Sequence, residues 1–197
     1  MYFKGGRGGL HPEESPMSRL PIPTLDAAPE ASKPILDTVR KQVGVVPNLF
    51  RLIATSPTAL TAYTGFQGAL GKALDVKTRE RIALAVAQVN GCDYCLSAHS
   101  YLAMNLAKIG PEEIALNRQG ASGDAKANAV VSFAAKVTAQ RGHIDDVDIA
   151  LVRAAGFSDA QIVEIVALVA ENTFTNYLNE VAKTDIDFPV VLAKDAA

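Results

Sequence analysis

Apolar residues recur along this chain in helix-forming stretches, and segments rich in Gly, Pro, Asn and Asp separate one stretch from the next. Ser56 followed by Pro57 is typical of a helix start, with Ser at the N-cap and Pro in the first turn. Asn48, Asp124 and Ser158 offer N-caps of the same kind. No segment shows a convincing strand pattern, so the sequence predicts an all-α protein. Its helices are expected at 34–43, 49–54, 57–71, 79–89, about 92–108, a short one from 111, 124–141, 145–155 and 159–170, the last extending with a break to about 183.

The first residues of the chain and the residues that follow them predict different structures. Residues 1–19 are rich in Gly and Pro with little to bury, which predicts a disordered tail, either native or a remnant added before Met17. The length of 197 residues fits one domain or two small, closely packed halves. We therefore expect a single all-α domain over residues 20–190, a helical bundle.

Residues 83–90 and 165–172 resemble each other, because each is an apolar helix that ends in Asn and precedes an aromatic-containing helix. Two interpretations stay open. The chain could hold two quasi-repeated halves, of which only the first kept its cysteines, or two Ala- and Val-rich helices could be alike by composition alone.

The composition narrows the class of protein. Hydrophobic residues make up 49% of the chain and Trp is absent, so the core must be built mainly from Ala, Val, Leu and Ile. A net charge of -2 without a basic run argues against a nucleic-acid partner, because phosphate binding needs clustered Lys and Arg. No apolar run has the length of a membrane span, and the N-terminus lacks the apolar core of a secretory signal. These features predict a cytoplasmic protein with no membrane partner.

Cys92 and Cys95 are the two cysteines of the chain, and they lie three residues apart. A disulfide that closes so short a loop adds little stability, because the stabilisation grows with loop length. In a reducing compartment such a pair is more often catalytic or metal-binding. The pair therefore marks the segment where chemistry is expected.

The pattern Glu80-x11-Cys92-Asp93-Tyr94-Cys95-x3-His99 gathers the candidate groups. On one helix, positions 92, 95 and 99 share a face. If Asn90-Gly91 is a turn between two antiparallel helices, Glu80 lies roughly 16 Å before it and His99 roughly 12 Å after it, at a rise of about 1.5 Å per residue. The two side chains are then nearly level, and we expect Glu80 to orient or charge-stabilise His99.

This arrangement suits thiol chemistry, because the thiolate is the reactive species. A helix N-terminus or an imidazolium lowers the pKa of a cysteine from about 8.5 into the range of roughly 3.5 to 7.5. Cys92 lies at the helix start, whereas Cys95 lies nearer to His99, which can serve as base and then as acid. The two effects favour different cysteines as the nucleophile, and the other sulfur would resolve the sulfenic acid into a disulfide.

The same pattern resembles that of the alkylhydroperoxidase D-like, peroxidase-related proteins of the carboxymuconolactone decarboxylase family. The segments 46–51 (VPNLFR), 56–57 (SP) and 79–81 (RER) also resemble that branch, and the resemblance covers most of residues 35–185. It implies an all-α fold that forms trimers or hexamers. It also implies cofactor-free reduction of organic hydroperoxides, with electrons from a partner thiol protein or a lipoyl-type dithiol.

Carried over by position, the resemblance implies that Cys95 attacks the peroxide and Cys92 resolves the product, with His99 and Glu80 as the proton relay. The best-known branch has a His before the second cysteine, where this chain has Tyr94. A phenol with a pKa near 10 is a poor base at neutral pH, so Tyr94 is expected to act at the site as a hydrogen-bond donor.

The cluster of Cys92, Cys95, His99 and Glu80 has other possible interpretations. A zinc site is disfavoured because three ligands on one rigid helix make closed tetrahedral ligation awkward, and an inert pair of buried cysteines is disfavoured by the nearby His and Glu. Two functional alternatives remain: an acid–base enzyme like a carboxymuconolactone decarboxylase, and a non-enzymatic redox-sensing subunit. Tyr63 and Phe66 are candidates for a peroxide pocket, although core packing is favoured for both. We expect no cofactor and no metal.

Overall fold

The computed structural model describes residues 18–195, and within that range it contains helices and no strand. The all-α prediction is therefore confirmed. The helices, in chain order, are the 3-10 helix η1 (Glu30–Ser32), α1 (Lys33–Val43), α2 (Asn48–Ile53), α3 (Pro57–Leu70), α4 (Val76–Asn90), α5 (Asp93–Asn105), α6 (Pro111–Arg118), α7 (Ala125–Ala139), α8 (Asp146–Ala154), α9 (Asp159–Ala182) and the 3-10 helix η2 (Ala193–Asp195). The predicted tail at residues 1–19 lies almost entirely outside the described residues.

Polar side chains cap most helices as the sequence predicts. Ser56 and Asp124 accept hydrogen bonds from the backbone N–H groups of Ala59 and Ala127, in the first turns of α3 and α7. Asn48, predicted as an N-cap, is instead the first residue of α2, and Pro47 holds the cap position. Asp187, far away in the sequence, accepts the Asn48 backbone N–H at 2.8 Å. The cap therefore comes from the C-terminal segment, residues 184–195, which follows α9.

Several predicted helix boundaries are wrong by a few residues. The helix of the CxxC segment ends at Asn105 rather than near 108, because Lys108 has a positive φ of 55° that an α-helix cannot continue through. Similarly, α7 ends at Ala139 rather than near 141, and Arg141 has a φ of 56°. The helix expected from residue 79 already begins at Val76, because Asp75 caps it through the Thr78 backbone N–H.

The last long helix shows no break. α9 runs without interruption from Asp159 to Ala182, where the sequence predicts an interruption after 170. Asn172 and Thr175 return their side chains to carbonyls of the same helix, at Leu168 and Asn172 respectively. These polar residues are therefore accommodated inside the helix and do not end it.

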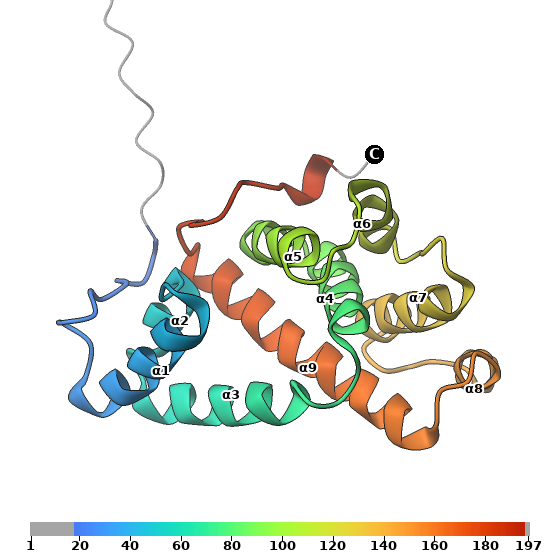
Figure 1. Ribbon diagram of the computed structural model, residues 1–197, viewed down its shortest axis with the longest axis horizontal. Coiled ribbons are helices and arrows are strands. Elements are labelled where there is room, and N and C mark those ends of the chain that lie inside the picture. The colour runs from blue at the N-terminus through green and yellow to red at the C-terminus, as the bar shows by residue number, and fades with distance from the viewer. Residues whose placement is uncertain (1–17, 196–197) are drawn as a thin grey trace, which may run out of the picture.

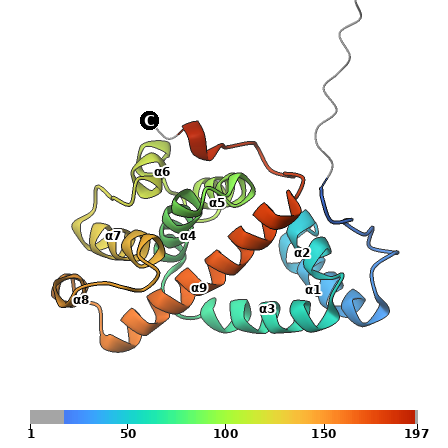
Figure 2. The ribbon, with the colours of Figure 1, turned by 180° about the vertical axis from the view of Figure 1, so that it is seen from behind.

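Helix α4 lies at the centre of the fold and packs against α5, α6, α7 and α9 (Figure 1). Its middle is apolar all round, with every residue from Ile82 to Ala87 buried, as a helix surrounded by others requires. The long α9 crosses the molecule obliquely and connects the α7–α8 side to the end formed by α1, α2 and α3 (Figure 2). A second core cluster, at that end, contains both cysteines.

The hairpin of α4 and α5 positions the chemistry of the CxxC segment. Gly91 ends α4 in the left-handed conformation, with φ 68° and ψ 28°, which glycine adopts without steric cost. The chain then reverses into α5, and the C-terminal segment returns over α5 (Figure 1). In that return, the backbone N–H groups of Val191 and Ala193 bond to the side chains of Ser97 and Asp93.

Within the described residues, no helix is both long and apolar enough to cross a membrane.

Candidate active site

The two cysteines lie side by side at the start of α5. Cys92 is the N-cap residue, and its sulfur accepts the backbone N–H of Cys95 at 3.3 Å. The two Sγ atoms are 2.7 Å apart and both thiols are free. A disulfide bond of about 2.05 Å could therefore form with little movement of the helix.

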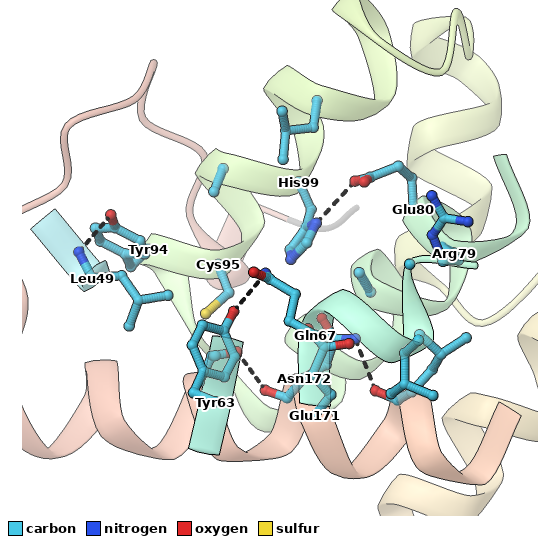
Figure 3. A pocket seen from close by; sticks show the side chains of 17 residues that line it. Leu49, Tyr63, Gln67, Arg79, Glu80, Tyr94, Cys95, His99, Glu171 and Asn172 are labelled. Atoms are coloured by element: carbon cyan, nitrogen blue, oxygen red, sulfur yellow. Dashed lines mark hydrogen bonds and ion pairs between the residues drawn. The ribbon is translucent and has the colours of Figure 1, made fainter. Parts of the chain in front are cut away.

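Only one of these sulfurs faces a pocket. A pocket of about 260 Å³ lies between α3, α4, α5 and α9, and Cys95 lines it whereas Cys92 does not (Figure 3). Cys92 is completely buried, among residues that include those of the C-terminal segment. A small molecule in the pocket would meet the sulfur of Cys95 first.

Glu80 and His99 also line this pocket, and they contact each other. His99 Nδ1 lies 2.9 Å from Glu80 Oε2, so the two side chains are level across the α4–α5 hairpin, as the helix geometry predicts (Figure 3). Burial by itself lowers the pKa of His99, but the Glu80 carboxylate outweighs it and raises that pKa above its usual value. Glu80 therefore favours the imidazolium form, with Nε2 left for the pocket side.

The environments of the two thiols move their pKa values apart. Burial raises the pKa of Cys95, but hydrogen bonds from Cys92 and Asn179 and the charge of His99 outweigh it and lower the pKa to about 7. The pKa of Cys92 is raised, by the hydrogen bond its thiol donates to Cys95 and by burial. Of the two effects that the sequence leaves in competition, the surroundings of Cys95 therefore dominate over the helix start at Cys92.

Tyr94 has its hydroxyl group committed to the protein. It donates a hydrogen bond to Asp187 Oδ1 at 2.8 Å and accepts one from the Leu49 backbone at 3.1 Å. Burial raises the pKa of Tyr94, so the phenol stays protonated at neutral pH. The side chain borders the pocket, but its polar atom ties α5 to α2 and to the C-terminal segment, which indicates a hydrogen-bonding and structural role.

The pocket also contains polar residues that sequence reasoning did not assign to the site. Tyr63, for which the sequence favours core packing over a place in the pocket, lines this pocket and accepts a hydrogen bond from Gln67. Phe66, the other candidate, does not line the pocket. Glu171, on α9, adds a second carboxylate, and burial raises its pKa. Glu171 precedes Asn172 in the segment that resembles residues 83–90, but nothing in the sequence places that segment beside the cysteines.

The structure also bears on the zinc interpretation. Within residues 18–195, no group of three or more His, Cys, Asp or Glu side chains is arranged to hold a metal ion. Glu80 contacts His99, and the cysteines contact each other, so the four groups form two pairs.

Parts of this sequence are similar to known proteins. Residues 57–136 match the carboxymuconolactone decarboxylase family. A protein of Haemophilus influenzae (strain ATCC 51907 / DSM 11121 / KW20 / Rd), described as uncharacterized, is 52% identical over 46 residues. That match involves 22% of this chain and spans 41% of the length of the curated relative.

Solved structures resemble the chain over most of its length. The alkylhydroperoxidase AhpD core of a peroxidase-related protein from Ralstonia eutropha JMP134 has a TM-score of 0.79 and 26% identity, over 88% of this chain and 94% of that one. A peroxidase-related protein from Silicibacter sp. TM1040 gives 0.76 and 25%, with the same coverage. The debrominase Bmp8 gives 0.71 and 20% over 88% of this chain and 93% of that one, a likeness of fold alone.

Proposed function

This chain belongs to the carboxymuconolactone decarboxylase family and has the all-α fold of its alkylhydroperoxidase D-like, peroxidase-related members, and from this premise we propose that it is a thiol-dependent peroxidase. Its substrates would be organic hydroperoxides, and its redox pair Cys92 and Cys95. The observation that carries the proposal is the position of Cys95: a thiol with a lowered pKa at the wall of a pocket, with a second thiol 2.7 Å behind it.

In the first proposed step, the Cys95 thiolate attacks the terminal oxygen of the hydroperoxide. The S–O bond forms as the O–O bond breaks, so the sulfur is oxidised to a sulfenic acid and the peroxide is reduced. His99, held as the imidazolium by Glu80, gives a proton to the departing alkoxide, which leaves as an alcohol. The pocket offers Leu70, Leu102 and Leu168 to the alkyl part of the substrate.

In the second proposed step, the Cys92 sulfur attacks Cys95 and displaces the sulfenic oxygen. The S–S bond forms and the S–O bond breaks, and the oxygen leaves as water, which carries the hydrogen of the sulfenic acid and the thiol proton of Cys92. An external dithiol, from a thiol protein or a lipoyl-type partner, then supplies two electrons and two protons to restore both thiols. Because Cys95 borders the pocket and Cys92 does not, the thiolate of the electron donor is expected to attack Cys95.

The test of these roles is a pair of serine variants in a peroxidase assay with an organic hydroperoxide. We expect Cys95→Ser to lose turnover completely. Cys92→Ser should lose turnover but accumulate a sulfenic acid on Cys95, which dimedone traps and mass spectrometry locates. Equal loss in both variants without any trapped oxide would reject the assignment.

A second candidate function is acid–base catalysis of the decarboxylase type. The observation in its favour is Glu171, a half-buried carboxyl group with a raised pKa in the same pocket as Glu80 and His99. A decarboxylation has no use for a redox dithiol, so its activity would survive in Cys95→Ser. The same variant therefore separates the two candidates.

A further inference from the structure

Helix α9 presents a row of buried amides to the helices that carry the site. Asn172, Asn176 and Asn179 follow the i, i+4, i+7 spacing of one helix face, and all three are buried, the last two almost completely. A buried amide costs free energy unless its hydrogen bonds are satisfied, so each of these residues needs a partner or a use.

Asn179 uses its amide on the reactive sulfur. Its Nδ2 donates a hydrogen bond to Cys95 Sγ at 3.3 Å, while no described residue bonds to its Oδ1. The amide is thus oriented with its donor toward the sulfur although its acceptor stays unsatisfied. The reversed orientation would bring an oxygen against a thiolate, which is repulsive.

Asn176 lies almost one turn earlier on the same face and is fully buried. Its Oδ1 accepts a hydrogen bond from Asn90 Nδ2 at 2.9 Å, which fixes the amide and directs Nδ2 to the opposite side. In the described part of the chain, that Nδ2 has no hydrogen-bond partner. Asn90 is the last residue of α4, immediately before the turn that leads to the cysteines. A second amide donor is therefore held ready beside the CxxC segment.

We propose that Asn179 and Asn176 form an amide pair that stabilises the thiolate of Cys95 and so selects Cys95, rather than Cys92, as the attacking sulfur. Asn179 contacts the reacting atom itself, and Asn90 is a positioning residue for Asn176. The use of that thiolate against a hydroperoxide rests on the proposed function, whereas its stabilisation is a property of the reduced protein.

The two sulfurs receive unequal support. Among the described residues, the Cys92 sulfur accepts only the backbone N–H of Cys95, whereas the Cys95 sulfur accepts the side-chain amide N–H of Asn179. Both Asn179 and Asn176 lower the pKa of Cys95 against the opposing effect of burial. Among the titratable groups around the two sulfurs, His99 on α5 lowers the pKa of Cys95 and Glu180 on α9 raises that of Cys92, whereas the charge of Cys95 itself raises the pKa values of Tyr63 on α3 and Tyr94 on α5. Of these groups, only His99 favours the thiolate of Cys95. Outside the cysteine pair, the other side chains that favour this thiolate are the amides of Asn179 and Asn176.

The experiment measures the rate of alkylation of Cys95 by iodoacetamide as a function of pH, with the alkylated residue located by mass spectrometry. In the wild-type protein we expect Cys95 to react first, with a midpoint near pH 7. Asn179→Ala should move the midpoint toward the ordinary value of about 8.5, which lowers the rate at pH 7 several-fold, and by roughly sixteenfold if the midpoint reaches that value. Asn179→Asp, of the same size, should move it at least as far, because a carboxylate opposes the thiolate. At a pH where the thiol is fully ionised, the variants should react as fast as wild type.

The matched control is Asn117→Ala, which removes an equally buried asparagine of α6 that bonds to Glu113 and Ala121, away from the cysteines. It should lower stability and leave the midpoint unchanged. A midpoint that stays unchanged in both Asn179 variants overturns the inference, even in a working peroxidase. A midpoint that moves as expected in a protein that consumes no hydroperoxide supports the amide pair and rejects the proposed function instead.

Discussion

In the proposed mechanism, the ionisation of Cys95 and that of His99 set opposite requirements on pH. Cys95 must lose its proton to attack, and its pKa is lowered to about 7, so activity should rise with pH through that region. His99 must carry its proton to the leaving oxygen, and Glu80 raises the pKa of His99, so activity should fall again at higher pH. The dependence of kcat/KM on pH is therefore expected to be bell-shaped.

Glu80→Gln removes the carboxylate that raises the pKa of His99. The descending limb of the profile should move to lower pH, while the ascending limb, set by Cys95, should move less, because Cys92 and Asn179 still lower the pKa of Cys95. Loss of the oriented proton donor should also lower kcat/KM by about 10² or more at the optimum. Measuring kcat/KM between pH 5 and about 10 for both proteins checks this. An unchanged descending limb would mean that His99 is not the group that titrates.

Tyr94→Phe separates a structural from a catalytic role for this residue. The change leaves the Leu49 N–H and the Asp187 carboxylate without their common partner, so the free energy of unfolding should fall by about 1–3 kcal/mol. Turnover should fall by less than tenfold, because the phenol keeps its proton and its O–H donates a hydrogen bond to Asp187. Urea unfolding and the peroxidase assay measure the two effects. Complete loss of turnover in a folded variant would give Tyr94 a direct part in the chemistry.

At the level of residues, the sequence predicts contacts along one hairpin better than contacts between distant segments. The level positions of Glu80 and His99 follow from the helical rise and one turn, and the structure confirms their contact. Asn179 and Glu171 reach the site because α9 packs against α5 and α3, some 80 residues along the chain, and no local spacing encodes that packing. The same holds for Asp187, which caps α2 in place of Asn48.

At the scale of elements, one glycine distinguishes the two similar segments. Asn90 is followed by Gly91, which takes the left-handed conformation and ends α4. Asn172 is followed by Thr173, which lies within the continuous α9. The resemblance of the two segments therefore stops at the turn, and the predicted break in the last helix is absent because no glycine follows Asn172, whose side chain bonds to the Leu168 carbonyl within the helix.

Gly91→Ala tests the importance of that turn. No neighbouring atom lies within 4 Å of the added Cβ, so the cost is the positive φ of 68° alone, about 1 kcal/mol of unfolding free energy. Gly68→Ala is the matched control, because its Cβ also meets nothing but the residue lies within α3. That control should raise stability by about 0.5–1 kcal/mol. Urea titration of both variants measures the pair, and equal shifts of one sign would contradict the account.

For the molecule as a whole, fold class was the part most open to prediction from sequence. Helix caps such as Ser56 and Asp124 and the absence of strand patterns are local signals, and the all-α fold follows from them. The C-terminal segment is different, because it has no apolar period and is held by side chains of α5, α4 and α6. Its bonds to Ser97, Gln88 and Arg118 became visible only in the structure.

We propose that α9 also contributes to association between copies of the chain, as the family resemblance implies. Large apolar side chains stay exposed along its length, each by 43% or more, which is unusual for so long a stretch in a monomer. They are Val163, Val166, Phe174, Tyr177 and Val181. Sedimentation velocity should give a homo-oligomer for the wild type and a smaller species for Tyr177→Glu with Val181→Glu. A monomeric wild type would contradict the proposal.

The central claim is that Cys92 and Cys95 are a redox pair oxidised by peroxide, and intact mass tests it most directly. The fully reduced protein is weighed before and after one equivalent of an organic hydroperoxide. The account predicts the loss of two hydrogen atoms, reversed by a dithiol and absent in Cys95→Ser. An unchanged mass, with both thiols still open to alkylation after denaturation, would contradict it and favour acid–base chemistry in the same pocket.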